Sequence, residues 1–167
     1  MSVNRGKQFE DIIRRAFEKV PGVSIDRIHD QTNFYKGSQN ICDFIVYKEP
    51  HEYYIECKSV HGASLPFRNI TDTQWDGLLE KSKIEGVYAG IICWFIDKDV
   101  TKFIPIRLLD YMRKFDGVKS YPYQFGGYLL DGGKGNEMFA IELKGNKKRV
   151  FFNYDMEEFF NEIQSDR

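Results

Sequence analysis

The segment from Ile41 to Lys58 constrains the fold more than any other part of the chain, because it predicts a β-hairpin with charges set inside apolar strands. The first strand is expected over Asn40–Tyr47 and the second over Glu52–Lys58. The four residues between them include Pro50, which is typical of a turn. An antiparallel strand pair is therefore the first element that the sequence predicts.

The register of the hairpin follows from its turn. If the four intervening residues form the loop, Tyr47 pairs with Glu52, and counting inward sets Asp43 directly opposite Glu56. Opposed residues of a sheet share a face, with Cβ atoms roughly 4.5–5.5 Å apart. Two bare carboxylates this close repel each other, and a divalent cation between them would remove that repulsion. The register therefore predicts a metal site.

Lys58 extends this site. Side-chain direction alternates along a strand, so Lys58 shares the face of Glu56, whereas Ile55 and Cys57 point into a core. Magnesium is usually held by one or two carboxylates, with water and phosphate oxygens completing its shell. It can activate a bound water, and a nearby lysine can orient that water or neutralise developing charge. The three charged residues indicate metal-assisted phosphodiester chemistry.

The same charges have a simpler interpretation, as a cluster on a solvated sheet face, where exposed ion pairs contribute little. For an isolated hairpin this second interpretation is favoured. The flanking apolar residues change the balance, because a largely buried hairpin makes an unpaired charge costly. These residues are Ile41, Phe44, Ile45, Val46 and Ile55.

The composition favours one ordinary globular domain spanning residues 1–167, since 42% of the residues are apolar and 29% are charged. No apolar run reaches the roughly 18–20 residues of a membrane span, and the N-terminus has no apolar segment typical of a secretory signal. The cysteines Cys42, Cys57 and Cys93 stand singly in apolar runs. We therefore expect reduced thiols and a cytoplasmic protein that binds no membrane.

The net charge of −1 counts mildly against nucleic-acid binding, because dedicated DNA-binding modules are usually basic. Phosphate contact depends on local charge, however, so DNA stays a possible partner. Local basic clusters occur at Arg14-Arg15, from Arg107 to Lys114, and from Lys144 to Arg149. Ordinary solvated surface is the favoured interpretation of each.

Hydrophobic periodicity completes the fold prediction. Apolar residues at helical spacing predict one helix over Asn4–Lys19 and a second from Thr71, and the continuous apolar run Val87–Ile96 predicts a central strand covered on both faces. Phe139–Leu143 and Arg149–Tyr154 are expected to form a peripheral hairpin, 59–69 a loop, and 30–39 a loop or short projecting segment. The order of elements predicts an α/β domain in which helices flank a mixed central sheet.

The chain resembles a known family at these residues. Asp43, a hydrophobic strand and then Glu56-Cys57-Lys58 resemble the signature of the PD-(D/E)XK nucleases, with Cys42 at the position of the family's proline. Two further segments, from Asn4 to Glu10 and from Ser64 to Gln74, resemble those of RecU-type Holliday junction resolvases. The resemblance covers roughly residues 4–95 and implies a restriction-endonuclease-like fold.

The resemblance also implies a function and residue roles. It implies a homodimeric, magnesium-dependent endonuclease, with manganese able to substitute, that resolves four-way DNA junctions by paired symmetric nicks. Asp43, Glu56 and the backbone carbonyl of Cys57 would hold the metal, and Lys58 would be the catalytic lysine. Glu10 and Gln74 would join the catalytic site, and phosphate contacts are expected from Arg5, Lys36 and Arg68.

Alternatives stay open at several of these positions. Thr71-Asp72-Thr73-Gln74 fits a capping box, in which Gln74 reaches back to its own helix start, and this role does not exclude one in the site. Glu10 also fits the surface of an amphipathic helix. For the whole chain, the alternatives are a restriction or repair nuclease of the same fold and a non-catalytic DNA-binding scaffold. The complete Asp43, Glu56 and Lys58 set argues against the scaffold.

Overall fold

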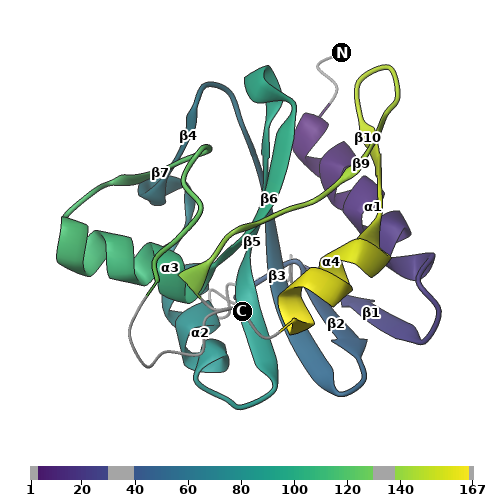
Figure 1. Ribbon diagram of the computed structural model, residues 1–167, viewed down its shortest axis with the longest axis horizontal. Coiled ribbons are helices and arrows are strands. Elements are labelled where there is room, and N and C mark those ends of the chain that lie inside the picture. Colours follow the sequence, from purple (N-terminus) through teal and green to yellow (C-terminus); the bar gives the residue numbers. More distant parts are fainter. Residues whose placement is uncertain (1–3, 30–39, 130–137, 166–167) are drawn as a thin grey trace, which may run out of the picture.

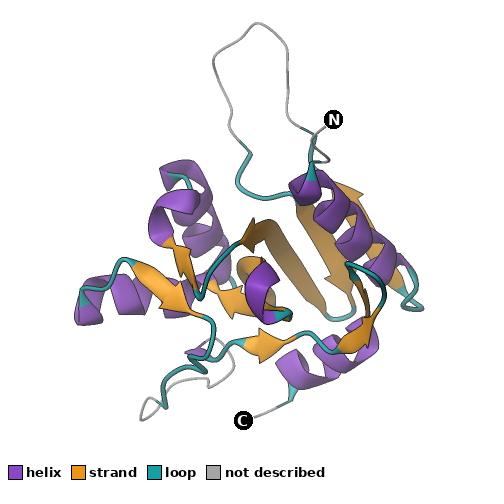
Figure 2. Ribbon diagram, turned by 90° about the horizontal axis from the view of Figure 1, so that it is seen from above, coloured by secondary structure: helices purple, strands orange, loops and turns teal. Residues whose placement is uncertain are grey.

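The computed structural model describes residues 4–29, 40–129 and 138–165. They form a six-stranded mixed sheet with helices on both faces, in the strand order β1-β2-β3-β5-β6-β8 (Figures 1 and 2). The predicted α/β class with a mixed central sheet is confirmed. The six strands are β1 (Val23–Arg27), β2 (Phe44–Lys48), β3 (His51–Val60), β5 (Val87–Phe95), β6 (Val100–Pro105) and β8 (Ile141–Glu142).

Each face of the sheet carries its own hydrophobic core. Helices α1 (Arg5–Glu18) and α4 (Met156–Gln164) cover one face, where Phe9 and Phe159 are buried. Helices α2 (Asp72–Ser82) and α3 (Ile106–Tyr111) cover the other, where Trp75 is buried. The central strand β5 is buried along nearly its whole length, as its apolar run predicts.

Local signals explain where the first two helices begin. The Asn4 side chain accepts a hydrogen bond from the Lys7 backbone N–H and caps α1. The helix ends before Gly22, a glycine whose backbone is in the left-handed conformation. Thr71 caps α2 in the same way. Strand β3 leads through α2 into β5, and because β3 and β5 are parallel, the helical crossover between them covers one face.

The β2–β3 hairpin has the predicted register, since Tyr47 pairs with Glu52. Its loop is shorter than expected, because Lys48 and His51 also pair and leave Glu49-Pro50 as the turn. The first strand also starts later than predicted. It begins at Phe44, so Asn40–Asp43 is not part of β2.

Two predictions about peripheral segments are wrong. The 59–69 segment, expected as a loop, continues β3 to Val60 and contains β4 (Ser64–Pro66) and a short 3-10 helix, η1 (Phe67–Asn69). Strand β4 pairs with β7 (Ser120–Pro122), a partner so distant in sequence that local patterns do not reveal it.

The expected peripheral hairpin also has different partners. The first segment supplies β8, which pairs with β6 at the edge of the main sheet. The second supplies β10 (Phe152–Tyr154), which pairs with β9 (Gly145–Lys147). Short η2 (Ile96–Lys98) and the π-helical η3 (Met112–Asp116) complete the elements.

Other predictions are not decided by the fold. The 30–39 segment lies outside the described residues, and one domain over 1–167 stays a prediction. Within the described chain, no helix is both long and apolar enough to cross a membrane. All three cysteines are buried and free of disulfides.

Candidate active site

Asp43 lies at the junction of three strands. Its backbone N–H donates to the Ile55 carbonyl at 3.0 Å, and its carbonyl accepts from the Ile28 N–H at 2.8 Å. Because Phe44 also pairs with Ile55, two residues of this chain segment face one residue of β3, which is the arrangement of a β-bulge. The prediction that Asp43 stands directly opposite Glu56 is therefore wrong in detail.

The bulge leaves the Asp43 carboxylate over the β3 backbone. Its Oδ2 accepts a hydrogen bond from the Cys57 N–H at 2.8 Å. In an extended strand the N–H and C=O of one residue point to the same side. The Cys57 carbonyl therefore points toward the Asp43 side of β3, as the predicted metal site requires, while the Cys57 side chain is buried in the α1 core.

Glu56 is the most buried charged residue of the site, with 5% of its surface exposed. Its Oε1 accepts a hydrogen bond from the Gln74 side chain, Nε2, at 2.8 Å. The same oxygen forms an ion pair with Lys58 Nζ at 2.8 Å. Lys58 thus shares the face of Glu56, as predicted from strand alternation, and the solvated-face interpretation of the cluster is wrong.

Gln74 caps its own helix and also contacts the carboxylate cluster. Its Oε1 accepts from the Thr71 N–H, and its own N–H donates to the Thr71 hydroxyl, which completes the capping box of α2. Because Thr71 N–H can only donate, the amide oxygen must face the helix start, and the amide NH₂ must face Glu56. The capping contact therefore determines that the amide NH₂ group, and not the amide oxygen, points toward Glu56.

Burial dominates the electrostatics of the two carboxyl groups. Burial, followed by the negative charge of Asp43, raises the pKa of Glu56 from 4.5 to about 7, although Lys58 opposes the shift. Burial also raises the pKa of Asp43 above its ordinary value, against the Cys57 N–H bond and the positive charge of Lys58. The positive charge of Lys58 therefore does not fully offset the burial and mutual repulsion of the two carboxyl groups near neutral pH.

These donors suit a hard divalent cation. Among the described residues, no three His, Cys, Asp or Glu side chains gather in a metal-binding group. The residues that would hold a magnesium ion are Asp43 and Glu56, through their carboxylates, and Cys57, through its carbonyl, with water completing a set within the usual preference of the ion. Added positive charge would offset the repulsion by Asp43 that, after burial, raises the pKa of Glu56.

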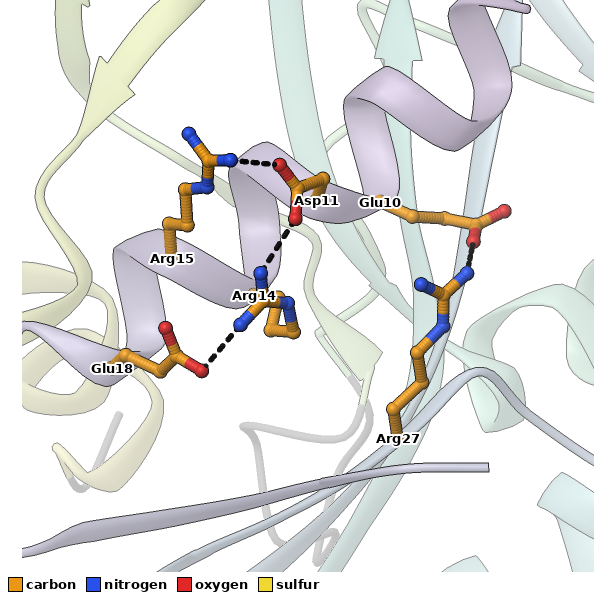
Figure 3. Close-up of polar contacts among 6 residues, drawn as sticks. All are labelled: Glu10, Asp11, Arg14, Arg15, Glu18 and Arg27. Atoms are coloured by element: carbon orange, nitrogen blue, oxygen red, sulfur yellow. Dashed lines mark hydrogen bonds and ion pairs between the residues drawn. The ribbon is translucent and has the colours of Figure 1, made fainter. Parts of the chain in front are cut away.

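Glu10 lies at the margin of this cluster, on α1. Its Oε2 forms an ion pair with Arg27 of β1 at 2.7 Å, on a different side of the helix from the Asp11, Arg14, Arg15 and Glu18 network (Figure 3). The positive charge of Arg27 also acts on the Asp43 carboxyl, where burial is the main influence on the pKa. Arg27 was not predicted, and its place beside the site depends on the pairing of β1 with β2.

The three expected phosphate contacts are placed differently. Arg5 is the first residue of α1 and is exposed, on the α1 side of the sheet. Arg68 is exposed on η1, just before the helix that carries Gln74. Lys36 lies outside the described residues. Asp43, Glu56, Lys58 and Gln74 thus form the cluster, whereas Arg5 and Arg68 lie on other elements.

Comparisons with known proteins give a partial likeness among solved structures. No family model and no curated protein matches the chain. Among solved structures it is similar to Hjc, a Holliday junction resolvase from the archaeal hyperthermophile Archaeoglobus fulgidus, with 15% sequence identity and a TM-score of 0.43. The match covers 64% of this chain and 78% of that one.

Proposed function

We propose that the protein is a magnesium-dependent endonuclease that acts on branched DNA and resolves four-way junctions. The observation that carries the proposal is the buried cluster of Asp43, Glu56, Lys58 and Gln74 on one hairpin and one helix start. Buried, coupled carboxylates with a raised pKa are typical of functional sites rather than of structural ion pairs. Within the cluster, Asp43, Glu56 and Lys58 also occupy the acidic and lysine positions of the PD-(D/E)XK signature, with Cys42 in place of its proline.

Asp43, Glu56 and the Cys57 carbonyl would hold the metal. When bound, magnesium or manganese would supply an activated water and stabilise charge on the phosphate. The protein's own contribution is orientation. The Cys57 N–H fixes the Asp43 carboxylate, and Gln74 fixes one oxygen of Glu56, so the second oxygen of Glu56 faces a preset direction.

Lys58 would act on the substrate. Its ammonium group lies 2.8 Å from Glu56 Oε1 and keeps 21% of the side-chain surface exposed, so it can turn toward an incoming phosphodiester. Hydrolysis builds negative charge on the phosphate and on the leaving oxygen. A compact cation held at this position stabilises that charge more in the transition state than in the bound substrate.

The choice of substrate rests on the motif resemblance around the cluster. The segments from Asn4 to Glu10 and from Ser64 to Gln74 support a RecU-type resolvase, with Arg5 and Arg68 as phosphate contacts and Glu10 near the metal's water shell. A twofold homodimer would present two such sites to two strands, and paired nicks would follow from that symmetry. Buried, unpaired thiols agree with a cytoplasmic location.

A cleavage assay tests the proposal. Purified protein with magnesium should cut a synthetic four-way junction into nicked duplexes and leave a linear duplex intact. Asp43→Asn should abolish cutting and keep binding, because the amide oxygen still accepts from the Cys57 N–H while one negative charge is lost. Asp76→Asn, an exposed carboxylate on α2, is the matched control and should cut normally.

The outcomes separate three functions. Equal cutting of junction and duplex would favour a general nuclease of the same fold. Binding of the junction without cutting would favour a DNA-binding scaffold. Wild-type rates from Asp43→Asn would contradict the assignment of the metal site.

A further inference from the structure

We infer that a second surface, the groove between the start of α1 and the β9–β10 loop, binds an unpaired segment of DNA. The groove has a volume of about 660 Å³, within the range of sites that hold one small organic group. Figure 1 shows the β9–β10 hairpin beside the N-terminal end of α1. The groove is lined by Arg5, Gln8, Lys148, Arg149, Val150 and Phe151.

The charge of the groove points to an anionic ligand. Three of its lining residues are cationic, and no carboxylate among the described residues lines it. Among the described residues, no ion pair is formed by Arg5, Lys148 or Arg149. Lys144 and Lys147, which lie nearby in the sequence, do form ion pairs. The positive end of the α1 dipole adds to this field. A phosphate backbone is the complementary partner.

The groove also has apolar lining residues, which favours bases over phosphate alone. Val150 is 50% exposed, an unusual state for a valine, and Phe151 is its neighbour in the lining. The faces of unpaired bases can stack on such residues, whereas a duplex hides them. Cationic and apolar lining residues together fit a single-stranded segment.

The loop that lines the groove is anchored to the core. The Lys148 N–H donates to the Phe151 carbonyl at 2.7 Å, which closes the loop as a tight turn. The Phe151 ring packs against Trp94, with ring centroids 5.3 Å apart, and Trp94 packs in turn against Phe9 of α1. The loop and the helix are thus held to the same buried indole.

Trp94 also locates the groove relative to the candidate active site. In the β3–β5 register Trp94 pairs with Ser59, the residue after Lys58, and neighbouring strands lie about 4.8 Å apart. The groove is therefore at the same level of the sheet as Lys58 but on its α1 face. A strand cut at Lys58 could continue over the end of the sheet into the groove. This inference rests on the proposed action on DNA.

The test measures binding without cleavage. In an Asp43→Asn background without metal, the probes are a fluorescein-labelled oligothymidylate and a duplex of the same length. Lys148→Ala/Arg149→Ala should weaken oligothymidylate binding and reduce its salt slope by about 1.4, the value for two lost phosphate contacts. Val150→Asp, at an exposed site, should weaken it at least about fivefold, the lower end for one base contact. Duplex binding should change little.

Lys81→Ala/Lys83→Ala is the control, because it removes two charges at the far end of α2 and should leave both affinities unchanged. Three results would overturn the inference: no loss in the groove variants, an equal loss for the duplex, or an equal loss in the control. The binding assay uses no metal and does not depend on cleavage. If the wild type failed to cut DNA in the cleavage assay, the nuclease proposal would be refuted, but none of these three binding results would follow.

Discussion

Glu56 offers the most direct test of the electrostatics of the site. The substitution Glu56→Gln keeps the size of the side chain and an oxygen that accepts from Gln74, but it removes the charge. In the wild type, burial and the charge of Asp43 raise the pKa of Glu56 from 4.5 to about 7 in the folded state. The folded protein therefore binds this proton more tightly than the unfolded chain does.

The sign and size of the effect follow from this difference. Between pH 4.5 and about 7 the folded state holds more protons, so the free energy of unfolding of the wild type falls as the pH rises. The difference between 4.5 and about 7, at about 1.4 kcal/mol per pH unit, corresponds to about 3 kcal/mol of lost stability above neutral pH. Glu56→Gln does not titrate and should escape this loss.

Urea unfolding at several pH values measures the prediction. The stability of Glu56→Gln relative to the wild type should rise from pH 4.5 to pH 7.5, by up to about 3 kcal/mol, without metal. Glu49→Gln, in the exposed turn of the same hairpin, is the control and should follow the wild type. A Glu56→Gln advantage that is flat with pH, or absent at pH 7.5, would refute the reasoning.

Two further predictions concern the partners of Glu56. Gln74→Glu should keep the capping box but lose the hydrogen-bond donor to Glu56. In the same unfolding assay the variant should be less stable than the wild type by about 2 kcal/mol at pH 8, with a smaller deficit at pH 5. An equal deficit at both pH values would contradict a charge effect. Lys58→Gln should slow junction cleavage about 10²–10³-fold, while magnesium should still raise the melting temperature as it does in the wild type. If magnesium no longer raised the melting temperature of the variant, Lys58 would instead have a structural role.

Much of the site could be predicted because it depends on short-range patterns. The register of the β2–β3 hairpin follows from the turn at Pro50, and alternation along β3 brings Glu56 and Lys58 to one face. The capping box of α2 is a local signal that places Gln74 at a helix start. Such features need only neighbouring residues, so the sequence is sufficient to predict them.

The rest depends on contacts between distant segments. The bulge at Asp43 exists because Ile28 and Ile55 bind its backbone from opposite sides, and neither contact has a local signal. Alternation in Phe139–Leu143 predicts a strand but not whether its partner is β6 or the following segment. The ion pair of Glu10 with Arg27 likewise depends on how α1 lies on the sheet.

The double contact of Gln74 ties local unfolding of α2 to the state of the site. Any opening of the first helical turn swings the amide away from Glu56, and any loss of that contact weakens the turn. Hydrogen exchange at the Gln74 and Trp75 backbone amides, which bond to Thr71, would therefore follow the protonation and ligation of a carboxylate in another element. Exchange at the start of α2 would thus report on the candidate active site.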